Sequence, residues 1–274
     1  LIQLAATPSR PLAARVWTDD VTAADLVRRL VGGHGGRPDL LDKASLDRLA
    51  VDAPHALGRW IGPDESVTVG DLLDELAQSI GAAWGGHPKR RKVVMHVLPD
   101  PTTAVPDWIV RDPQIFRIEA SVQPPPPASV TLQGMRNAVV LTADQVAGVV
   151  ARHTAWAAHL ARPHVDQRAS DDVAVGSENP AARDDPPILT WHTTRAGLAA
   201  ETERRLQLLQ GDDVVGGREV LLIDVVDDVL GLDWATAVVE LQSVRHVTTA
   251  RSKRFVLLSV EVDGRPRVPA VLWG

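Results

Sequence analysis

Cysteine is absent from this chain of 274 residues. That absence excludes disulfide bonds, a thiol nucleophile and thiolate ligands for zinc. Tyrosine is absent as well, and phenylalanine occurs only at positions 116 and 255, so tryptophan is nearly the whole aromatic inventory. No run of apolar residues approaches the length of a membrane-spanning helix, so we expect no membrane span.

The eight tryptophans are spread along the sequence rather than clustered. Carbohydrate platforms and many enzyme pockets rely on several clustered aromatic side chains, and the spacing here does not predict such a cluster. We expect most of the tryptophans to be anchors in a core or at an interface with another protein. They are Trp17, Trp60, Trp84, Trp108, Trp156, Trp191, Trp234 and Trp273.

Acidic residues outnumber basic ones by 35 to 29, which gives a net charge of −6. Binding to phosphates needs a basic surface, so nucleic acid is not the expected principal partner. The start of the sequence, LIQLAATPSRP, has no basic region ahead of an apolar stretch, so no signal peptide is predicted. It also lacks an initiator methionine, and we expect the chain to be a fragment of a longer protein.

Residues 69–80 predict an amphipathic helix, because apolar side chains recur there at helical spacing. Thr68 is the expected N-cap, and Asp71 completes a capping box. Gly81 can adopt the left-handed conformation that ends a helix. Trp84 follows among glycines, where we expect it to cover the end of a small core.

A compact α/β unit is predicted around this helix. Two further helices are expected before it, over 23–31 with Thr22 as the cap and over 43–50. After it, the basic run KRRK (89–92) predicts a turn, and 93–98 predict a strand. The unit has roughly a hundred residues, an ordinary size for a domain.

The remainder of the chain is predicted to be richer in strands. In chain order we expect strands over 114–122, 129–134 and 137–141, a helix over 143–161 capped by Thr142 and Gln145, a polar loop over 164–187, a short strand over 188–191 and a helix over 195–209. Residues 218–274 contain four closely spaced apolar segments separated by Gly and Asp. Such spacing is typical of a small antiparallel barrel or sandwich.

The nine histidines do not predict a metal site. His153 and His159 are six residues apart on the expected helix, so their side chains lie on different faces and cannot chelate one ion together. His153 falls on the apolar stripe of that helix, which predicts a packed or hydrogen-bonded core histidine. No HExxH pattern is present.

Other chemical candidates have simpler explanations. The glycine-rich GGHGG (32–36) follows a helix, whereas a phosphate cradle follows a strand and precedes a helix, so a turn is predicted there. No Gly-x-Ser-x-Gly elbow is present. KRRK is interpreted as a solvated turn, with a subunit contact as the alternative. Acidic pairs at 19–20, 171–172, 184–185, 212–213 and 227–228 fall mostly in expected loops, which favours solvated charge over general acid–base catalysis. No catalytic, cofactor-binding or metal-binding residue is therefore predicted.

Four segments, taken in their order and spacing, resemble the baseplate hub (tail-tip) proteins of long-tailed bacteriophages, the group that includes host-attachment tail proteins and gene-transfer-agent hubs. The segments are GRWIGPDESVTVGDLLDELAQSIGAAWG (58–85), RIEASVQPPPPASVTLQGMRNAVVLTADQVAGVV (117–150), AAETERRLQLL (199–209) and AVLWG (270–274). The resemblance implies an α+β fold, with a peripheral α/β domain and a split antiparallel β-barrel interrupted by a helical excursion. By this analogy residues 1–16 end a preceding hub segment, 17–111 form the α/β domain, 112–141 and 211–274 form the barrel, and 142–210 form the excursion.

The resemblance also implies a homotrimer without enzymatic activity, located at the tail tip of the virion. Its implied partners are the distal tail protein, other tail-tip proteins, the tape-measure protein and the central fibre, with DNA only in passage and no cofactor. Such a hub joins the distal tail ring to the central fibre or spike and gates the tail channel. Two other classes stay open: a tail-associated cell-wall hydrolase, which would need two carboxylates or a His–metal pair at one cleft, and an adhesion module that binds a host receptor.

Overall fold

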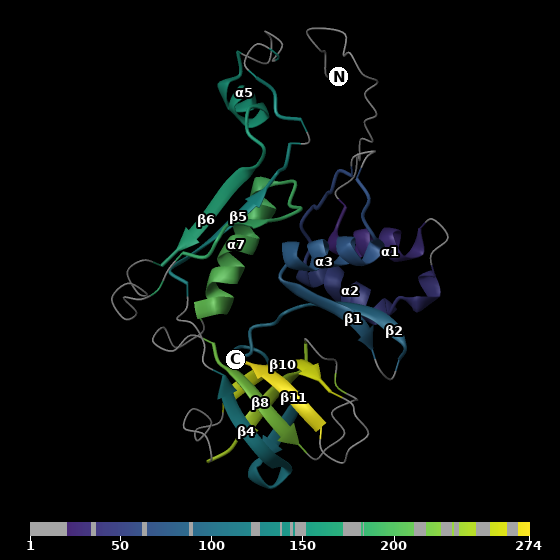
Figure 1. The fold of residues 1–274 in the computed structure, drawn as a ribbon, viewed down its shortest axis with the longest axis vertical. Coiled ribbons are helices and arrows are strands. Elements are labelled where there is room, and N and C mark those ends of the chain that lie inside the picture. Colours follow the sequence, from purple (N-terminus) through teal and green to yellow (C-terminus); the bar gives the residue numbers. More distant parts are fainter. Residues whose placement is uncertain are drawn as a thin grey trace.

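A computed structural model gives three groups of elements, which we call the helical unit, the small sheet and the large sheet (Figure 1). It describes residues 21–33, 37–61, 65–87, 90–121, 127–137, 139–142, 145, 152–171, 182, 184–210, 218–225, 232, 236–244, 253–261 and 268–274. Five α-helices and eleven strands occur within those ranges, which confirms the predicted α+β class.

The helical unit holds three helices against a two-stranded hairpin. Its elements are α1 (Ala23–Gly32), a 3₁₀ turn (Pro38–Leu40), α2 (Lys43–Asp52), α3 (Val69–Ser79), β1 (Ala82–His87) and β2 (Lys92–Val97). Both predicted threonine caps are present, because Thr22 and Thr68 each form a capping box with the aspartate three residues later. Leu49, Leu76 and Met95 are fully buried at the centre of this unit. Burial of each such side chain contributes about 1.5–3 kcal/mol.

Strand β1 differs from the prediction for the residues after α3. Gly81 does take the predicted left-handed conformation, with φ of 56°. The glycine-flanked Trp84, however, lies within a strand, where it pairs with Met95 of β2 in antiparallel register. Its indole N–H also donates to Asp74 at 2.7 Å. The glycines Gly85 and Gly86 have low strand propensity, which concealed this strand in the sequence.

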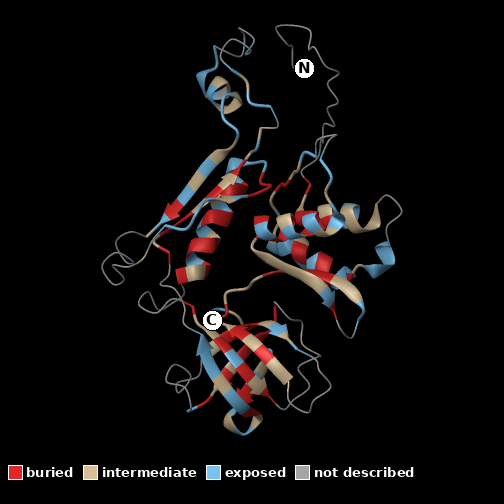
Figure 2. Cartoon of the chain, in the orientation of Figure 1, coloured by how far each residue is buried: buried red, intermediate tan, exposed pale blue. Residues whose placement is uncertain are grey.

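The large sheet is six-stranded and curls into a half-barrel (Figure 1). Its order is β3 (Trp108–Arg111), β9 (Val238–Gln242), β10 (Lys253–Val260), β11 (Val268–Trp273), β8 (Val220–Val225) and β4 (Ile115–Ser121), with a 3₁₀ turn (Asp112–Gln114) between β3 and β4. Among the described strands of this sheet, β3 and β9 are parallel neighbours and the other pairs are antiparallel. Buried residues alternate with more exposed ones along β8 and β11 (Figure 2), and Phe255, Leu221 and Leu241 are fully buried in the core of this sheet.

The small sheet and helix α7 lie between the two halves of the large sheet in the sequence. The sheet has the order β6 (Val165–Ser170), β5 (Ser129–Gly134) and β7 (Ile188–Leu189), and α7 (Arg195–Gln210) covers one face of it. The predicted barrel segment 112–141 included β5, but β5 pairs with β6 and β7 instead of joining the large sheet. Leu132 on β5 and Leu198 on α7 are both fully buried in one hydrophobic cluster. The packing of α7 therefore holds β5 in the small sheet rather than in the large sheet.

Three further local predictions were wrong. The expected loop 164–187 contains β6. Half of this strand is exposed and its side chains are mostly polar, which made the segment resemble a loop in the sequence. The described residues of 137–141 form no strand, since Asn137 donates from its side-chain amide to the carbonyls of His159 (2.5 Å) and Arg162 (2.6 Å) and so ties this loop to a helix end. Within the expected helix 143–161, the described residues 145, 152 and 153 are not helical, and the helix that the structure describes is α5 (Thr154–Leu160).

His153 is not the predicted core histidine, because it is exposed at the N-cap of α5. Most of the rest of the predicted 143–161 helix, residues 143–144 and 146–151, lies outside the described residues. Where its start is described, Gln145 accepts from the Thr142 amide at 3.0 Å, as one half of the predicted capping box.

The tryptophans differ in burial. Trp191 is buried, Trp84, Trp108 and Trp273 are half-buried, and Trp60 is exposed. Trp17, Trp234 and the side chain of Trp156 lie outside the described residues.

Candidate functional site: a polar junction between the units

Residues 190–193 connect the small sheet to the helical unit. On one side, the Gly58 amide donates to the Trp191 carbonyl at 2.8 Å. On the other side, the Met135 amide, just after β5, donates to the His192 carbonyl at 2.6 Å. One extended segment therefore carries backbone hydrogen bonds to both units, and it sets their relative position.

Trp191 is also bound through its own N–H groups. Its backbone amide donates to the Ser79 hydroxyl at 3.1 Å, and that hydroxyl donates to the Glu75 carbonyl at 2.7 Å. Its indole N–H donates to the Glu75 carboxylate at 3.2 Å. The same carboxylate accepts from Arg59 at 3.0 Å, and Arg59 also pairs with Glu65. Each buried polar atom of Trp191 is thus paired across the junction.

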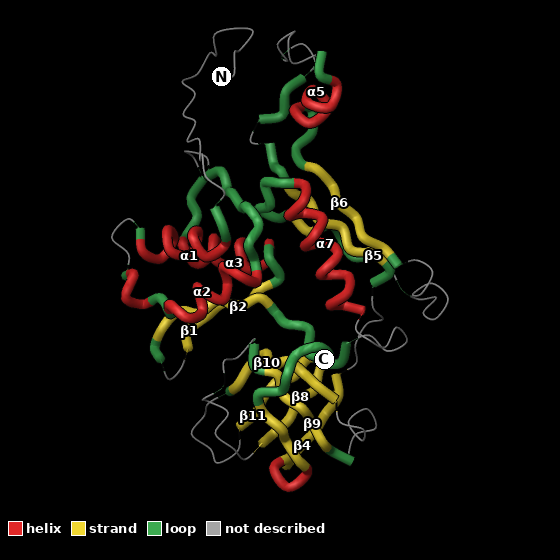
Figure 3. Tube along the Cα trace, turned by 180° about the vertical axis from the view of Figure 1, so that it is seen from behind, coloured by secondary structure: helices red, strands yellow, loops and turns green. Residues whose placement is uncertain are grey.

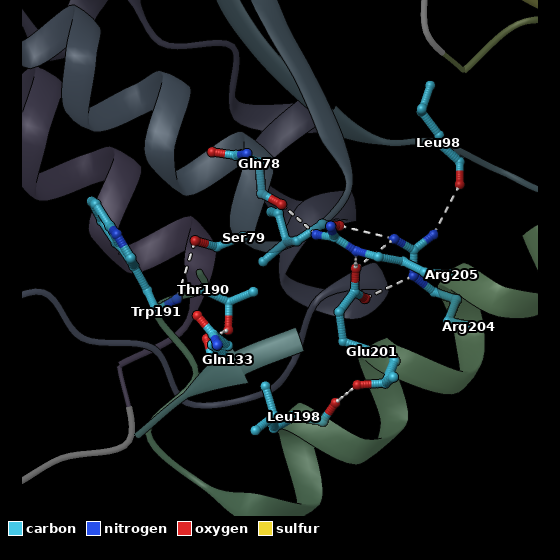
Figure 4. A network of polar contacts seen from close by, with 12 residues as sticks. Gln78, Ser79, Leu98, Gln133, Thr190, Trp191, Leu198, Glu201, Arg204 and Arg205 are labelled. Atoms are coloured by element: carbon cyan, nitrogen blue, oxygen red, sulfur yellow. Dashed lines mark hydrogen bonds and ion pairs between the residues drawn. The ribbon is translucent and has the colours of Figure 1, made fainter. Parts of the chain in front are cut away.

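Helix α7 places two arginines at the C-terminal end of α3 (Figure 4). Arg204 donates to the Ile80 carbonyl at 3.0 Å, and Arg205 donates to the Gln78 carbonyl. The last carbonyls of a helix have no partner within the helix and carry partial negative charge. Arginine side chains from another helix therefore donate hydrogen bonds to these unpaired carbonyls and place positive charge beside the negative end of the helix dipole.

Glu201 balances the two arginines. Its carboxylate accepts from Arg204 at 2.8 and 2.9 Å and from Arg205 at 2.7 Å. Burial would raise the pKa of Glu201, but the two guanidinium groups outweigh burial and lower that pKa below its ordinary value. The spacing Glu-x-x-Arg-Arg puts the three side chains on one face of α7, one turn apart.

Gly81 makes room for this network. Its positive φ favours glycine. A Cβ at this position would also lie 2.4 Å from the Arg204 guanidinium and 3.2 Å from the Glu201 carboxylate. The residue that ends α3 thus also admits the arginine that caps it.

His192 is buried beside this network. Neither ring nitrogen has a hydrogen-bond partner among the described residues. Burial lowers the pKa of His192 to about 4, although the Glu201 charge acts in the opposite direction. The ring is therefore neutral at pH 7, and it meets the edge of His55 at 6.4 Å between ring centroids.

A second junction joins the large sheet to the rest of the chain through Arg218. Its guanidinium donates to the Leu208 carbonyl near the end of α7 at 2.8 Å and to the Asp100 carboxylate at 2.8 Å. It also lies 5.4 Å from the centre of the Trp273 ring on β11. Residues 98–107 form the loop between the helical unit and the large sheet (Figure 3). Asp100 belongs to this loop, so the loop itself takes part in the contact.

The acidic pairs and the KRRK turn, which were considered as chemical candidates in the sequence, do not meet at one site in the described part of the structure. Asp184 accepts from the Ser129 hydroxyl at 2.7 Å and pairs with Arg168 at 3.2 Å, while burial, with the Asp184 charge, raises the pKa of Asp185. Arg90 of the KRRK turn pairs with Asp42 at 3.3 Å. The acidic pairs 19–20, 212–213 and 227–228, and one member of 171–172, lie outside the described residues.

Among the described residues, no group of three or more His, Cys, Asp or Glu side chains is placed to hold a metal ion. None of the helices in the same ranges has the length and apolar character needed to cross a membrane. The network of Glu201, Arg204 and Arg205 was not predicted from the sequence, although their spacing in α7 indicates that the three side chains share one helix face.

Comparison with known proteins gives structural matches only. No protein-family model matches the sequence, and no curated protein matches it. A chain from the virion of a native gene transfer agent particle matches with a TM-score of 0.56 at 13% identity, over 91% of this chain and 46% of that chain. The 43 kDa tail protein of prophage MuSo2 from Shewanella oneidensis matches with a TM-score of 0.40 at 12% identity, over 78% of this chain and 56% of that chain.

This chain therefore spans about half the length of the solved chains it matches. Identity this low supports a statement about architecture alone. The chain shares its fold with a protein of a gene transfer agent virion.

Proposed function

We propose that this chain is a structural subunit of a phage-type tail, located in the virion at the tail tip. The observation that carries the proposal is the match to a gene transfer agent virion chain over 91% of the sequence. The junctions support it, because the hydrogen bonds from Arg204 and Arg205 to the end of α3 and the Arg218–Asp100 ion pair hold the helical unit, the small sheet and the large sheet in one arrangement. A part that transmits force between neighbouring rings needs such fixed geometry.

Within the tail, the proposed role is the central hub. Three copies would form a ring that joins the distal tail ring to the central fibre or spike and gates the tail channel. The tape-measure protein and DNA would pass through it, and other tail-tip proteins would contact its outside. The proposed division of the chain keeps 17–111 as the peripheral domain and 142–210 as the excursion, with β5 assigned to the excursion side.

Strand β4 is the proposed contact between copies. It lies at an edge of the large sheet, and most of its residues are exposed (Figure 2). Phe116 on this strand is 48% exposed. A strand that ends the order of its sheet is a place where a second chain can pack, and an exposed aromatic ring adds apolar area to the contact.

Native mass spectrometry of the purified chain tests the stoichiometry, and three copies are expected. A purified chain that stays monomeric at every concentration, together with a single copy in isolated tail tips, would contradict the hub. Phe116→Glu should shift the protein toward monomer by placing a charge in the contact. The matched control is Val51→Glu on α2, because Val51 is 75% exposed and lies outside β4.

The hydrolase alternative predicts clearing of cell-wall polymer in a zymogram of the purified chain. The described acidic pair does not favour it, since Asp184 is engaged by Arg168 and Ser129. We propose a structural rather than an enzymatic role.

A further inference from the structure

A cleft of about 670 Å³ lies between the helical unit and the small sheet. Its described wall includes Trp60, Gln78, Arg136, His159 and Leu189. These residues come from the loop after α2, from α3, from the segment after β5, from α5 and from β7. The volume falls within the range of small-molecule sites, and such sites occur preferentially where two units meet.

The charges in this wall are nearly balanced. Arg59 contributes a cation, and it is paired with the carboxylates of Glu65 and Glu75. Arg136 contributes a second cation, which is exposed. Two arginines facing two glutamates do not form the basic surface that a polyphosphate or a nucleic acid needs.

Two tryptophans that are far apart in the sequence meet at this cleft. Trp191 forms part of the buried wall, and its indole N–H is already bound to Glu75. Trp60 is 44% exposed, and Leu189, also 44% exposed, lines the same cleft. An indole face left partly in water is an apolar platform with a polar edge, which suits a ligand that has one apolar face and many polar groups.

A sugar ring has those properties. Its C–H face packs on an indole, while its hydroxyl groups need both donors and acceptors. Gln78 offers an amide with both, His159 offers a ring that is donor and acceptor when neutral, and Arg136 offers a fork of donors. A neutral wall of this composition matches saccharide hydroxyls better than it matches a strongly charged or a wholly apolar ligand.

We propose that this cleft binds a short oligosaccharide, with Trp60 as the stacking platform and Arg136 as a donor to ring hydroxyls. The proposal goes beyond the structural role, because a hub can assemble whether or not it holds a sugar. It gives the chain a means of contacting a glycan at a cell surface.

The test is isothermal titration calorimetry of the full chain with four defined probes: maltohexaose, cellohexaose, chitohexaose and a hyaluronan hexasaccharide. At least one probe is expected to bind the wild type with Kd below about 1 mM. Trp60→Ala and Arg136→Ala should each weaken that binding by about tenfold or more, which corresponds to about 1.4 kcal/mol. Trp60→Phe keeps an aromatic face and should retain most of the affinity.

Arg37→Ala is the matched control for Arg136→Ala, because Arg37 is an exposed arginine that lies outside both the cleft and β4. Circular dichroism establishes that each variant is folded before titration. Absence of binding by all four probes would overturn the proposal. Binding that survives both Trp60→Ala and Arg136→Ala would overturn it too, since the sugar would then be held elsewhere. Either result leaves the trimer measurement unaffected.

Discussion

Arg204 donates a hydrogen bond to the carbonyl oxygen of Ile80 at 3.0 Å, across 124 positions of sequence. The acceptor belongs to the end of α3, and the donor belongs to α7. A helix terminus that would otherwise need solvent is completed by a residue from another unit. This pairing couples the two units rigidly, and the carboxylate of Glu201 supports it by balancing the charge of the arginine.

Glu201→Gln should reduce the free energy of unfolding by about 3–5 kcal/mol, because it leaves two closely placed guanidinium groups without their counter-charge. Glu201 is buried, so solvent cannot replace the carboxylate. Chemical denaturation of the purified chain measures the change. Glu203→Gln, two residues along the same helix and exposed, is the matched control. Equal stability of the two variants would show that the network is not essential.

Gly81→Ala should destabilise the chain by more than about 1 kcal/mol, because a side chain there meets both an unfavourable φ and the Arg204 guanidinium. Gly86→Ala is the comparison, since a Cβ at Gly86 would have no atom within 4 Å. Thermal unfolding followed by circular dichroism measures both variants. The prediction fails if the two substitutions have the same effect.

Acid should weaken the junction through His192. The pKa of this ring is about 4 in the folded chain, against an ordinary value of 6.5, so the unfolded chain binds the proton more readily. Stability is therefore independent of this group above pH 6.5 and falls as the pH decreases toward 4, by a total of about 3 kcal/mol. Unfolding free energies measured from pH 7 to pH 4.5 follow most of this change and largely avoid the ordinary range in which carboxyl groups titrate.

His192→Gln removes the titrating group and should flatten that pH dependence, whatever its effect on absolute stability. His153→Gln is the control, because it makes the same substitution at an exposed position at the start of α5, away from this junction. An unaltered slope in His192→Gln would assign the acid sensitivity to other groups.

Local signals in the sequence predicted most of the helices, since a cap and a periodic apolar face act within a few residues. Thr68 with Asp71, and Gly81 after them, are examples that the structure confirms. Strands β1 and β6 were missed because glycines and polar residues hid their pattern, and their pairing depends on partners elsewhere in the chain. The curled large sheet was predicted in outline from its closely spaced apolar segments.

The junction could not be predicted, because nothing in a sequence says which distant backbone groups an arginine will reach. The spacing of Glu201, Arg204 and Arg205 indicates one helix face, but their acceptors lie in α3. The same limitation applied to the tryptophans. Trp60 and Trp191 are far apart in sequence, and only the folded chain places them at one cleft.

Arg218→Lys should loosen the large sheet from the rest of the chain. Arginine reaches the Leu208 carbonyl with one nitrogen and the Asp100 carboxylate with another, while its plane lies over Trp273. Lysine keeps the charge but loses the planar fork and the stacking face. Asp100, whose pKa burial would raise but hydrogen bonds from Thr102 and the Arg218 charge lower overall, would lose part of its stabilisation.

The expected cost of Arg218→Lys is about 1–3 kcal/mol. Scanning calorimetry should show it as a second, lower transition, and limited proteolysis should cut sooner within the loop of residues 98–107. Arg37→Lys is the control, because Arg37 is exposed, lies outside the large sheet and pairs with Asp39 two residues away. A single transition at the wild-type temperature in Arg218→Lys would mean that the backbone connection and the remaining contacts hold the large sheet in place without this side chain.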